Sequence, residues 1–149
     1  MKNYTSSVPV EVTVMRIEKL LVKYGATKVA KEYVAGEVAA LTFTIMEPKT
    51  QREMRIHLPV KPKSVAKVLI AQYTKLQSGT ERRIQEQSAR TAWKLMQDWV
   101  EVQLSLIEME QAEFVQIFLP YLYDGKRTYY ESLKEEGFKL LGEGKKEKV

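Results

Sequence analysis

Apolar residues recur at helical spacing near the start of the chain. Between residues 9 and 24 the apolar side chains lie three or four positions apart, which predicts an amphipathic helix. Its apolar positions are Val10, Val14, Ile17, Leu20, Leu21 and Tyr24. Ser7 is placed to cap this helix, Pro9 falls in its first turn, and Gly25 is expected to end it.

The period changes to alternation between residues 27 and 58, which is typical of strands with one buried face. The apolar positions are Leu41, Phe43, Ile45, Met54, Ile56 and Leu58. Turn-forming residues at 35–36 and 47–49 divide the stretch into three strands. We therefore expect an antiparallel meander that packs its apolar face on helices and leaves its other face open. The open face would carry Thr42, Thr44, Arg55 and His57.

Helical spacing returns over residues 62–136. A second helix is predicted to begin near Pro62, and a long third helix is predicted to run from about residue 80 to about residue 112. Two short helices should follow, the first ended by Pro120 and Gly125 and the second by Gly137.

Ser78 and Glu81 have the spacing of a capping box for the long helix. Residues 141–149 contain little to bury and are predicted to form a flexible tail. We therefore expect one α+β domain over residues 1–140, with an N-terminal helix, a three-stranded antiparallel meander and a helical C-terminal half.

The long helix is apolar over more than half of its circumference. One apolar row is Trp93, Met96, Val100, Leu104 and Ile107, and the row beside it is Leu95, Trp99, Val102, Leu106 and Met109. Such a helix needs cover on two sides, and about 33 residues would reach roughly 50 Å, which is longer than a domain of this size is wide. We therefore predict a homo-oligomer whose interface contains Trp99, Val102, Gln103 and Leu106.

Carboxylates occupy the narrow polar stripe of the same helix, together with Gln97. Asp98, Glu101 and Glu108 are neighbours on this stripe, but no histidine joins them and the chain contains no cysteine. A solvated helix edge explains them better than an active site does. A small metal-dependent hydrolase that uses these three carboxylates is therefore the third hypothesis for function.

Few groups in the chain are suited to catalysis. The absence of cysteine excludes disulfides and thiolate metal sites, and no glycine motif for phosphate binding is present. His57 is the only histidine. It fits a strand histidine on a polar sheet face better than a metal ligand or a general base. We expect a non-enzymatic protein with no metal and no small-molecule cofactor.

Nothing in the sequence indicates insertion into a membrane or export. No apolar run approaches the roughly 20 residues that span a bilayer, and the first residues lack the layout of a signal peptide. A cytoplasmic protein is expected, and the abundance of lysine and glutamate with a single asparagine is typical of a thermophilic source.

Positive charge is concentrated in the first part of the chain. Residues 1–90 carry sixteen lysines and arginines against eight acidic residues, whereas residues 91–149 carry eight against eleven. This asymmetry favours an anionic partner, or docking of one half on the other in an oligomer. The densest basic cluster is Lys49, Arg52, Arg55, Lys61, Lys63 and Lys67.

Proteins that bind single strands combine a positive groove for the backbone with aromatic platforms for the bases. The basic cluster would contact phosphates, while Tyr33 and His57 would stack on bases or form hydrogen bonds with them. A second basic group lies at the start of the long helix and would extend this surface: Arg82, Arg83, Arg90 and Lys94. A sheet face that only keeps the protein soluble has the same pattern, so both interpretations stay open.

The C-terminal half carries four short motifs in order: an Arg-x-Ala-Trp start, a Trp-Val-Glu-x-Gln centre, a Phe-Leu-Pro-Tyr-Leu close and a Gly-x-x-Thr-x-Tyr-Glu helix. Their residues are Arg90, Ala92, Trp93, Trp99, Val100, Glu101, Gln103, Phe118 to Leu122, Gly125, Thr128, Tyr130 and Glu131. With these motifs the C-terminal half resembles a family of small uncharacterised proteins of bacteriophages and mobile elements. The resemblance implies a viral or mobile-element setting, in which small basic proteins often serve DNA replication or recombination.

The leading hypothesis is a non-enzymatic nucleic-acid-binding protein that prefers single-stranded DNA, has little sequence preference and acts in phage DNA replication or recombination. The alternative is a protein–protein interaction factor that docks on a host or phage enzyme through the long helix. In a phage setting the expected location is the cytoplasm of the host cell.

Overall fold

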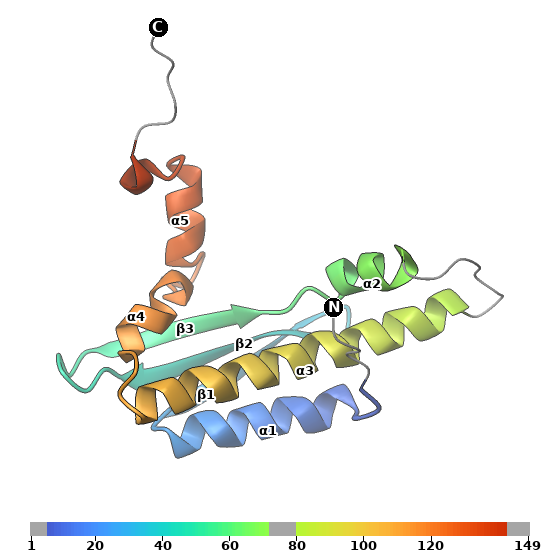
Figure 1. Ribbon diagram of the computed structural model, residues 1–149, viewed down its shortest axis with the longest axis horizontal. Helices are drawn as coiled ribbons and strands as arrows, with labels where there is room; N and C mark the ends of the chain where they lie inside the picture. The colour runs from blue at the N-terminus through green and yellow to red at the C-terminus, as the bar shows by residue number, and fades with distance from the viewer. Residues whose placement is uncertain (1–5, 72–79, 143–149) are drawn as a thin grey trace, which may run out of the picture.

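The computed structural model describes residues 6–71 and 80–142. The elements follow one another as α1 (Val10–Lys23), β1 (Lys28–Val34), β2 (Glu37–Met46), β3 (Glu53–Pro59), α2 (Pro62–Ala71), α3 (Thr80–Glu108), α4 (Phe114–Phe118), the 3-10 helix η1 (Leu119–Tyr121), α5 (Tyr129–Glu135) and the 3-10 helix η2 (Lys139–Leu141) (Figure 1). The predicted α+β class, with a helix, a three-stranded sheet and then helices that include a long one, is confirmed.

The first helix ends where the sequence predicts, but its cap is different. Gly25 follows α1 with φ +110°, a conformation that glycine adopts at little cost. At the other end Pro9, not Ser7, is the N-cap, so the prediction for Ser7 was wrong. Pro9 is held in the extended region, and its carbonyl already accepts the first helical hydrogen bonds, from Val12 and Thr13. The side chain of Ser6 instead accepts the N–H of Val8.

The three strands form one antiparallel sheet in the order β1-β2-β3, as the alternating pattern predicts. Ala35 and Gly36 join β1 to β2 with φ values of 53° and 81°. A two-residue hairpin turn with both φ angles positive matches the twist of the strands that it joins. In the second pair Phe43 lies opposite Ile56, so the apolar residues of both strands point to the same face.

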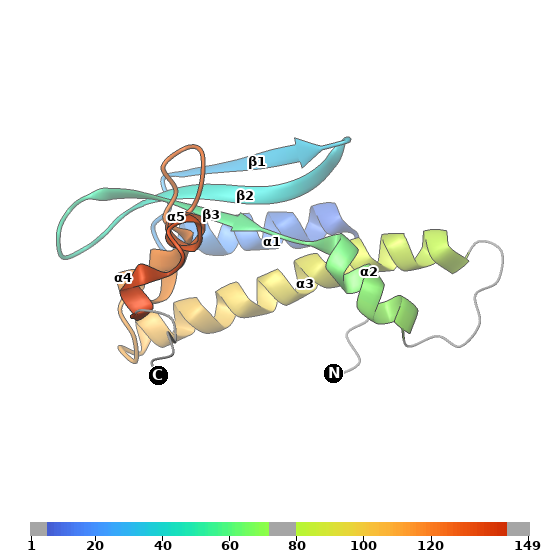
Figure 2. The ribbon, with the colours of Figure 1, turned by 90° about the horizontal axis from the view of Figure 1, so that it is seen from above.

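The core lies between the sheet and two helices. Figures 1 and 2 show α1 and α3 side by side along one face of the sheet. Phe43 and Ile56 from the sheet are buried together with Ile17 of α1 and Trp93 of α3. Trp93 also donates its ring N–H to the carbonyl of Val38 at 3.3 Å. The one polar group of the largest core side chain therefore has a hydrogen-bond partner.

Helix α3 is the longest element, with 29 residues and a length of about 44 Å. It ends at Glu108, four residues before the predicted end near residue 112. Glu110 adopts a left-handed conformation with φ 58°, and Gln111 donates its N–H to the carbonyl of Leu106 at 2.8 Å. This is the hydrogen-bond pattern of a Schellman ending. The sequence did not reveal it because glutamate stands where glycine is usual.

Two sequence predictions fall partly or wholly outside the described residues. Ser78, the expected cap of α3, is one, and the larger part of the expected tail is the other. Leu141 belongs to η2, so the first residue of the expected tail is helical. None of the helices in the described part of the chain is long and apolar enough to cross a membrane.

Candidate nucleic-acid interface

The segment after η1 adds to the free edge of the sheet. Leu122 forms an isolated antiparallel bridge with Ile56, and the N–H of Tyr123 donates to the carbonyl of Arg55 at 2.8 Å. Neighbouring residues of a strand point to opposite faces. Leu122 therefore points to the core and Tyr123 to the outer face of the sheet.

Tyr123 covers part of the outer face that the sequence predicts to be open. Its ring stacks on His57 with the centroids 4.4 Å apart, and the guanidinium of Arg55 lies 5.8 Å from the centre of the same ring. Thr44, on the same face, is buried. The prediction of an open face was therefore wrong for Thr44, which is buried, while His57 is half-buried because a segment far along the chain returns to the sheet.

His57 is part of a hydrogen-bonded group that crosses all three strands. Its Nδ1 lies 3.0 Å from Oγ1 of Thr42 on β2 and 3.1 Å from a carboxylate oxygen of Glu32 on β1. Thr42 lies directly opposite His57 in the register of the sheet. These contacts hold the imidazole ring by one nitrogen and by its stacked face.

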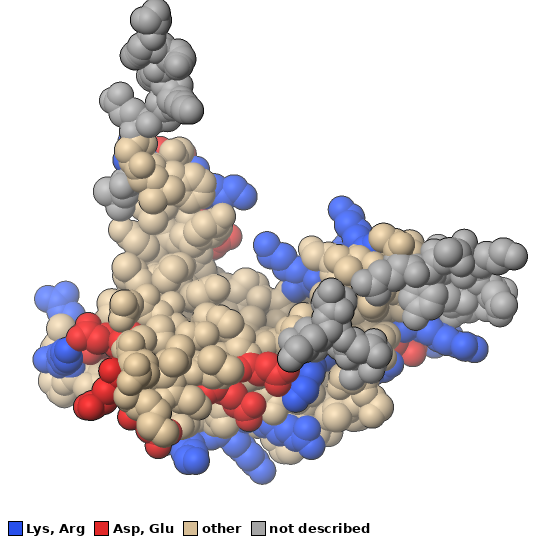
Figure 3. Space-filling model, viewed as in Figure 1, with Lys and Arg blue, Asp and Glu red and all other residues tan. Residues whose placement is uncertain are grey.

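A cleft of about 970 Å³ opens beside this group. One wall is formed by His57, Pro59 and Lys61, at the end of β3 and just beyond it. The other wall comes from η1 and α5. In Figure 1 α5 stands out from the rest of the molecule, and Figure 3 shows the hollow between α5 and α2 with basic side chains on both sides. The cleft therefore depends on the position of the C-terminal segment.

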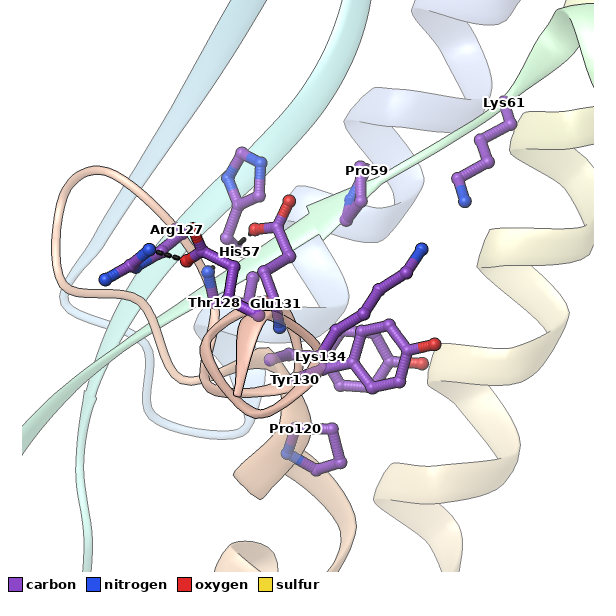
Figure 4. A pocket seen from close by; sticks show the side chains of 11 residues that line it. His57, Pro59, Lys61, Pro120, Arg127, Thr128, Tyr130, Glu131 and Lys134 are labelled. Carbon is purple, nitrogen blue, oxygen red and sulfur yellow. Dashed lines mark hydrogen bonds and ion pairs between the residues drawn. The ribbon is translucent and has the colours of Figure 1, made fainter. Parts of the chain in front are cut away.

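The two lysines of the cleft differ from its arginine in their ion pairing. Arg127 forms an ion pair with Glu135, whereas neither Lys61 nor Lys134 has an ion-pair partner within residues 6–71 and 80–142. Figure 4 shows the ammonium groups of Lys61 and Lys134 extending from opposite walls toward the same region. Tyr130, which is 49% exposed, lies beside Lys134 on the α5 wall.

Glu131 is an acidic side chain that lines the cleft, and it has a structural role. It accepts the N–H of Thr128 at 2.8 Å, while the hydroxyl of Thr128 accepts the N–H of Glu131 at 3.2 Å. This capping box begins α5. The hydrogen bond from the Thr128 backbone lowers the pKa of Glu131, and the hydrogen bond with the Thr128 side chain and the nearby charge of Arg127 lower it further. Glu131 therefore stays ionised while it holds α5 in place.

The structure divides the basic residues predicted from the sequence into three groups. His57 and Lys61 line the cleft, and Arg55 lies next to it on the outer face of the sheet. Lys63 and Lys67 are on α2 and line a second groove of about 700 Å³ between α2 and α3.

The third group lies at the far end of β3. Lys49 and Arg52 are in the connection between β2 and β3, and Lys49 forms an ion pair with Glu113. Lys61 follows Arg52 by nine residues, and an extended chain rises about 30 Å over nine residues. Tyr33 is 60% exposed near the end of β1 and does not line the cleft. The predicted surface is therefore not a single site.

Sequence analysis missed the wall that α5 contributes. Arg127, Tyr130 and Lys134 were assigned to a short closing helix without a role, although Tyr130 belongs to the motif of the resemblance. The sequence shows the capping box of Thr128 and Glu131 and the basic and aromatic residues that follow it. It does not show that this helix stands opposite Lys61.

The carboxylates of α3 do not form a cluster, and two of them bind other side chains. Asp98 pairs with Lys94 at 3.1 Å, and Glu108 accepts the hydroxyl of Tyr24 at 2.5 Å, which raises the pKa of that tyrosine. Among the described residues no three His, Cys, Asp or Glu side chains are grouped so that they would hold a metal ion. Gln97 is buried, with no hydrogen-bond partner for its Oε1 among the described residues, so its placement on the solvated stripe was wrong.

The residues predicted to form an oligomer interface have two environments. The Trp99 ring packs edge-on against Phe118 and Tyr121, with centroids 5.7 and 5.4 Å apart. Gln103 is half-buried, while Val102 and Leu106 are exposed. The structure therefore uses most of Trp99 within the chain and leaves Val102 and Leu106 available for a partner.

Comparison with known proteins identifies no relative. No protein-family model, no curated protein and no solved structure matches this chain.

Proposed function

We propose that the protein binds single-stranded nucleic acid, with a preference for DNA and little dependence on base sequence, through the cleft between β3 and α5. The observation that carries this proposal is the pair formed by Lys61 and Lys134. These two side chains reach into one cleft from opposite walls, without an ion-pair partner among the described residues, beside the exposed ring of Tyr130. The protein acts as a binder and not as an enzyme in this proposal.

The physical basis is the pairing of ammonium groups with aromatic faces. Lys61 and Lys134 contact phosphates, and Tyr130 stacks on a base. Stacking tolerates any base because each base has a flat π-face, which accounts for weak sequence preference. Binding releases counterions from the strand, so the logarithm of the affinity falls with the logarithm of salt concentration with a slope of about −0.7 per phosphate contact.

The size of the cleft favours one strand over a duplex. Its volume of about 970 Å³ is at the upper end of the range for small-molecule sites. Such a space admits the bases of one strand, whereas in a duplex the bases are paired and their faces stacked on each other. The exposed guanidinium of Arg55 and the lysines of α2 extend the positive surface on either side.

A role in phage or mobile-element DNA replication or recombination is part of the proposal and is supported by the family resemblance of the C-terminal half. The residues of the proposed cleft include Tyr130 and Glu131 of the resembling motif. The cytoplasm of the host cell is the compartment in which such a protein acts.

The test is fluorescence anisotropy of a labelled single-stranded DNA, titrated with the protein over a series of salt concentrations, with duplex DNA and RNA as competitors. The double variant K61Q/K134Q should bind at least about tenfold more weakly and flatten the salt slope by about 1.4, because two phosphate contacts are lost. The double variant K19Q/K28Q loses the same charge from exposed positions outside the cleft and is the matched control. Equal effects of the two variants, or no binding at low salt, would reject the proposal.

The alternative function, docking on another protein through α3, is supported by the exposed apolar residues Val102, Leu106 and Met109. The same titration separates the two functions. Absence of nucleic-acid binding at low salt, where electrostatic contacts are strongest, would leave the surface of α3 as the functional site.

A further inference from the structure

The two ring nitrogens of His57 have different surroundings. Nδ1 lies 3.0 Å from Oγ1 of Thr42 and 3.1 Å from a carboxylate oxygen of Glu32. Nε2 has no hydrogen-bond or ion-pair partner in the described part of the chain. Because the side chain lines the cleft between β3 and α5, this second nitrogen is a group that a ligand in the cleft can contact.

The partners of Nδ1 determine which nitrogen carries the proton. The hydroxyl of Thr42 donates to the same carboxylate oxygen of Glu32, with 3.3 Å between the two oxygens. The single hydroxyl proton is then used, so the oxygen of Thr42 can only accept from His57, and an ionised carboxylate also only accepts. Both partners therefore require the proton on Nδ1. In the neutral ring Nε2 is then a hydrogen-bond acceptor without a proton.

A second acceptor lies beside this ring. The carboxylate of Glu131 accepts hydrogen bonds from Thr128 alone among the described residues, whereas an ionised carboxylate has about four acceptor sites. Its side chain is exposed and lines the same cleft as His57. Figure 4 shows the carboxylate next to the imidazole ring, and the two side chains are near enough for a charge on one to affect the other. This part of the cleft therefore holds two adjacent acceptors.

Two adjacent acceptors select a group that carries two donors. The exocyclic amino group of cytosine or adenine has two N–H donors, whereas thymine and guanine have a keto oxygen at the corresponding ring position. Uracil resembles thymine in this respect. An amino group can donate one hydrogen to each acceptor. A keto oxygen would place a third acceptor against them and leave all three without a donor, which is costly once water is displaced.

We propose that His57 and Glu131 recognise the amino group of one base, so that the cleft prefers cytosine or adenine to uracil, thymine or guanine at that position. Acidic side chains that accept from the amino group of cytosine are a known form of base contact. Glu32 and Thr42 are positioning residues, since they hold the tautomer of His57 that accepts at Nε2. The preference concerns one base of the bound strand, so the overall dependence on sequence stays weak.

This inference rests on the proposed binding of single strands and adds recognition of a base to it. Phosphate contacts carry no direct information on sequence. Lys61 and Lys134 therefore determine the affinity, while His57 and Glu131 determine the preference between bases. The ratio of two affinities tests the inference, and the affinity itself tests the proposed function.

Two strands that differ in this one group are the probes. Labelled oligodeoxycytidylate and oligodeoxyuridylate of equal length are titrated by fluorescence anisotropy at neutral pH and at one salt concentration. All positions of each strand carry the same base, so the register of binding does not affect the comparison. The dissociation constant should be at least about fivefold higher for oligodeoxyuridylate, which is the lower end of the discrimination by one good base contact.

The variant E131Q changes the group that faces the base and keeps the cap of α5. Its amide oxygen can accept the N–H of Thr128, as in a capping box with glutamine, so its NH2 donor faces the cleft. The ratio of the two dissociation constants should fall to about one or below, because a donor suits the keto oxygen. E101Q removes the same charge from an exposed position outside the cleft and should leave the ratio unchanged.

The variant H57F removes the second acceptor and keeps an aromatic ring against Tyr123. It should also reduce the ratio, and circular dichroism verifies that all three variants fold. Equal binding of the two strands by the wild type, or a preference for oligodeoxyuridylate, would overturn the inference. Equal changes of the ratio in E131Q and E101Q would overturn it too.

The variant K61Q/K134Q separates this inference from the proposed function. If the wild type binds both strands equally and K61Q/K134Q weakens both, the proposed function is retained and base recognition alone is rejected. If neither strand binds at low salt, where electrostatic contacts are strongest, both are rejected.

Discussion

The two faces of the sheet belong to the same three strands, but different kinds of contact cover them. On the inner face Leu41, Phe43 and Leu58 are fully buried against α1 and α3. On the outer face His57 is held by a few directed contacts, with Tyr123 stacked on its ring and Glu32 bonded to Nδ1. Apolar burial is non-directional and proportional to area, whereas hydrogen bonds and stacking depend on geometry. We therefore expect the inner face to determine stability and the outer face to determine binding.

The largest expected effect is on the inner face. Phe43→Ala should lower the free energy of unfolding by about 3–5 kcal/mol, because it removes a buried aromatic ring and leaves a cavity. Phe43 is fully buried and packs edge-on against Phe118 at 5.8 Å. Thr42→Ala on the outer face is the control and should cost about 1 kcal/mol through its lost hydrogen bonds. Urea unfolding measures both, and equal losses would contradict the difference between the faces.

The next effect concerns binding on the outer side. Tyr130→Ala should weaken single-strand binding by about 1–3 kcal/mol, the usual loss for one stacked base, with little change in stability. Tyr33→Ala is the control, because Tyr33 is 60% exposed but lies outside the cleft. Anisotropy titrations at one salt concentration compare the two variants. A larger loss of affinity in Tyr33→Ala than in Tyr130→Ala would place the nucleic-acid-binding site at the end of β1 and not at α5.

A smaller effect should distinguish Arg55, on the outer face of the sheet, from Arg52 in the β2–β3 connection. Arg55→Glu should weaken binding several-fold and flatten the salt slope by about 0.7, because one phosphate contact is lost. Arg52→Glu makes the same change of charge in the β2–β3 connection, and it should have a smaller effect on both quantities. The salt series of both variants tests this order. Equal slopes would show that the basic surface acts as a whole and that the cleft has no special role.

The smallest effect should appear at acid pH. The pKa of Glu131 is lowered, chiefly by the backbone N–H of Thr128, so its ionised form stabilises α5. A lowered pKa in the folded state means that this contribution is fully present above about pH 4.3, the ordinary glutamate value. It is lost as the pH falls through the folded pKa. In E131Q the free energy of unfolding should therefore depend less on pH below about 4.3 than in the wild type. Identical pH profiles from urea unfolding would show that ionisation of Glu131 does not stabilise α5, since glutamine at this position can still form the capping box.

The sequence by itself determined the order of the elements and the composition of the core. Alternation placed Phe43 and Ile56 on one face, and the helical period placed Trp93 and Val100 in one apolar row of α3, which the structure buries in the core. Such patterns are readable because the side-chain periods of strands and helices are local properties of the backbone. The same locality explains the accurate end of α1 at Gly25.

The tertiary structure alone decided what surrounds the outer face. Leu122 bridges Ile56, and this contact brings Tyr123 onto His57 and sets Lys134 across from Lys61. No period in the sequence encodes that approach, because it depends on where α3 ends and on how the chain turns at Glu110. The core could be predicted from local patterning, while the cleft is produced by the return of a distant segment to the edge of the sheet.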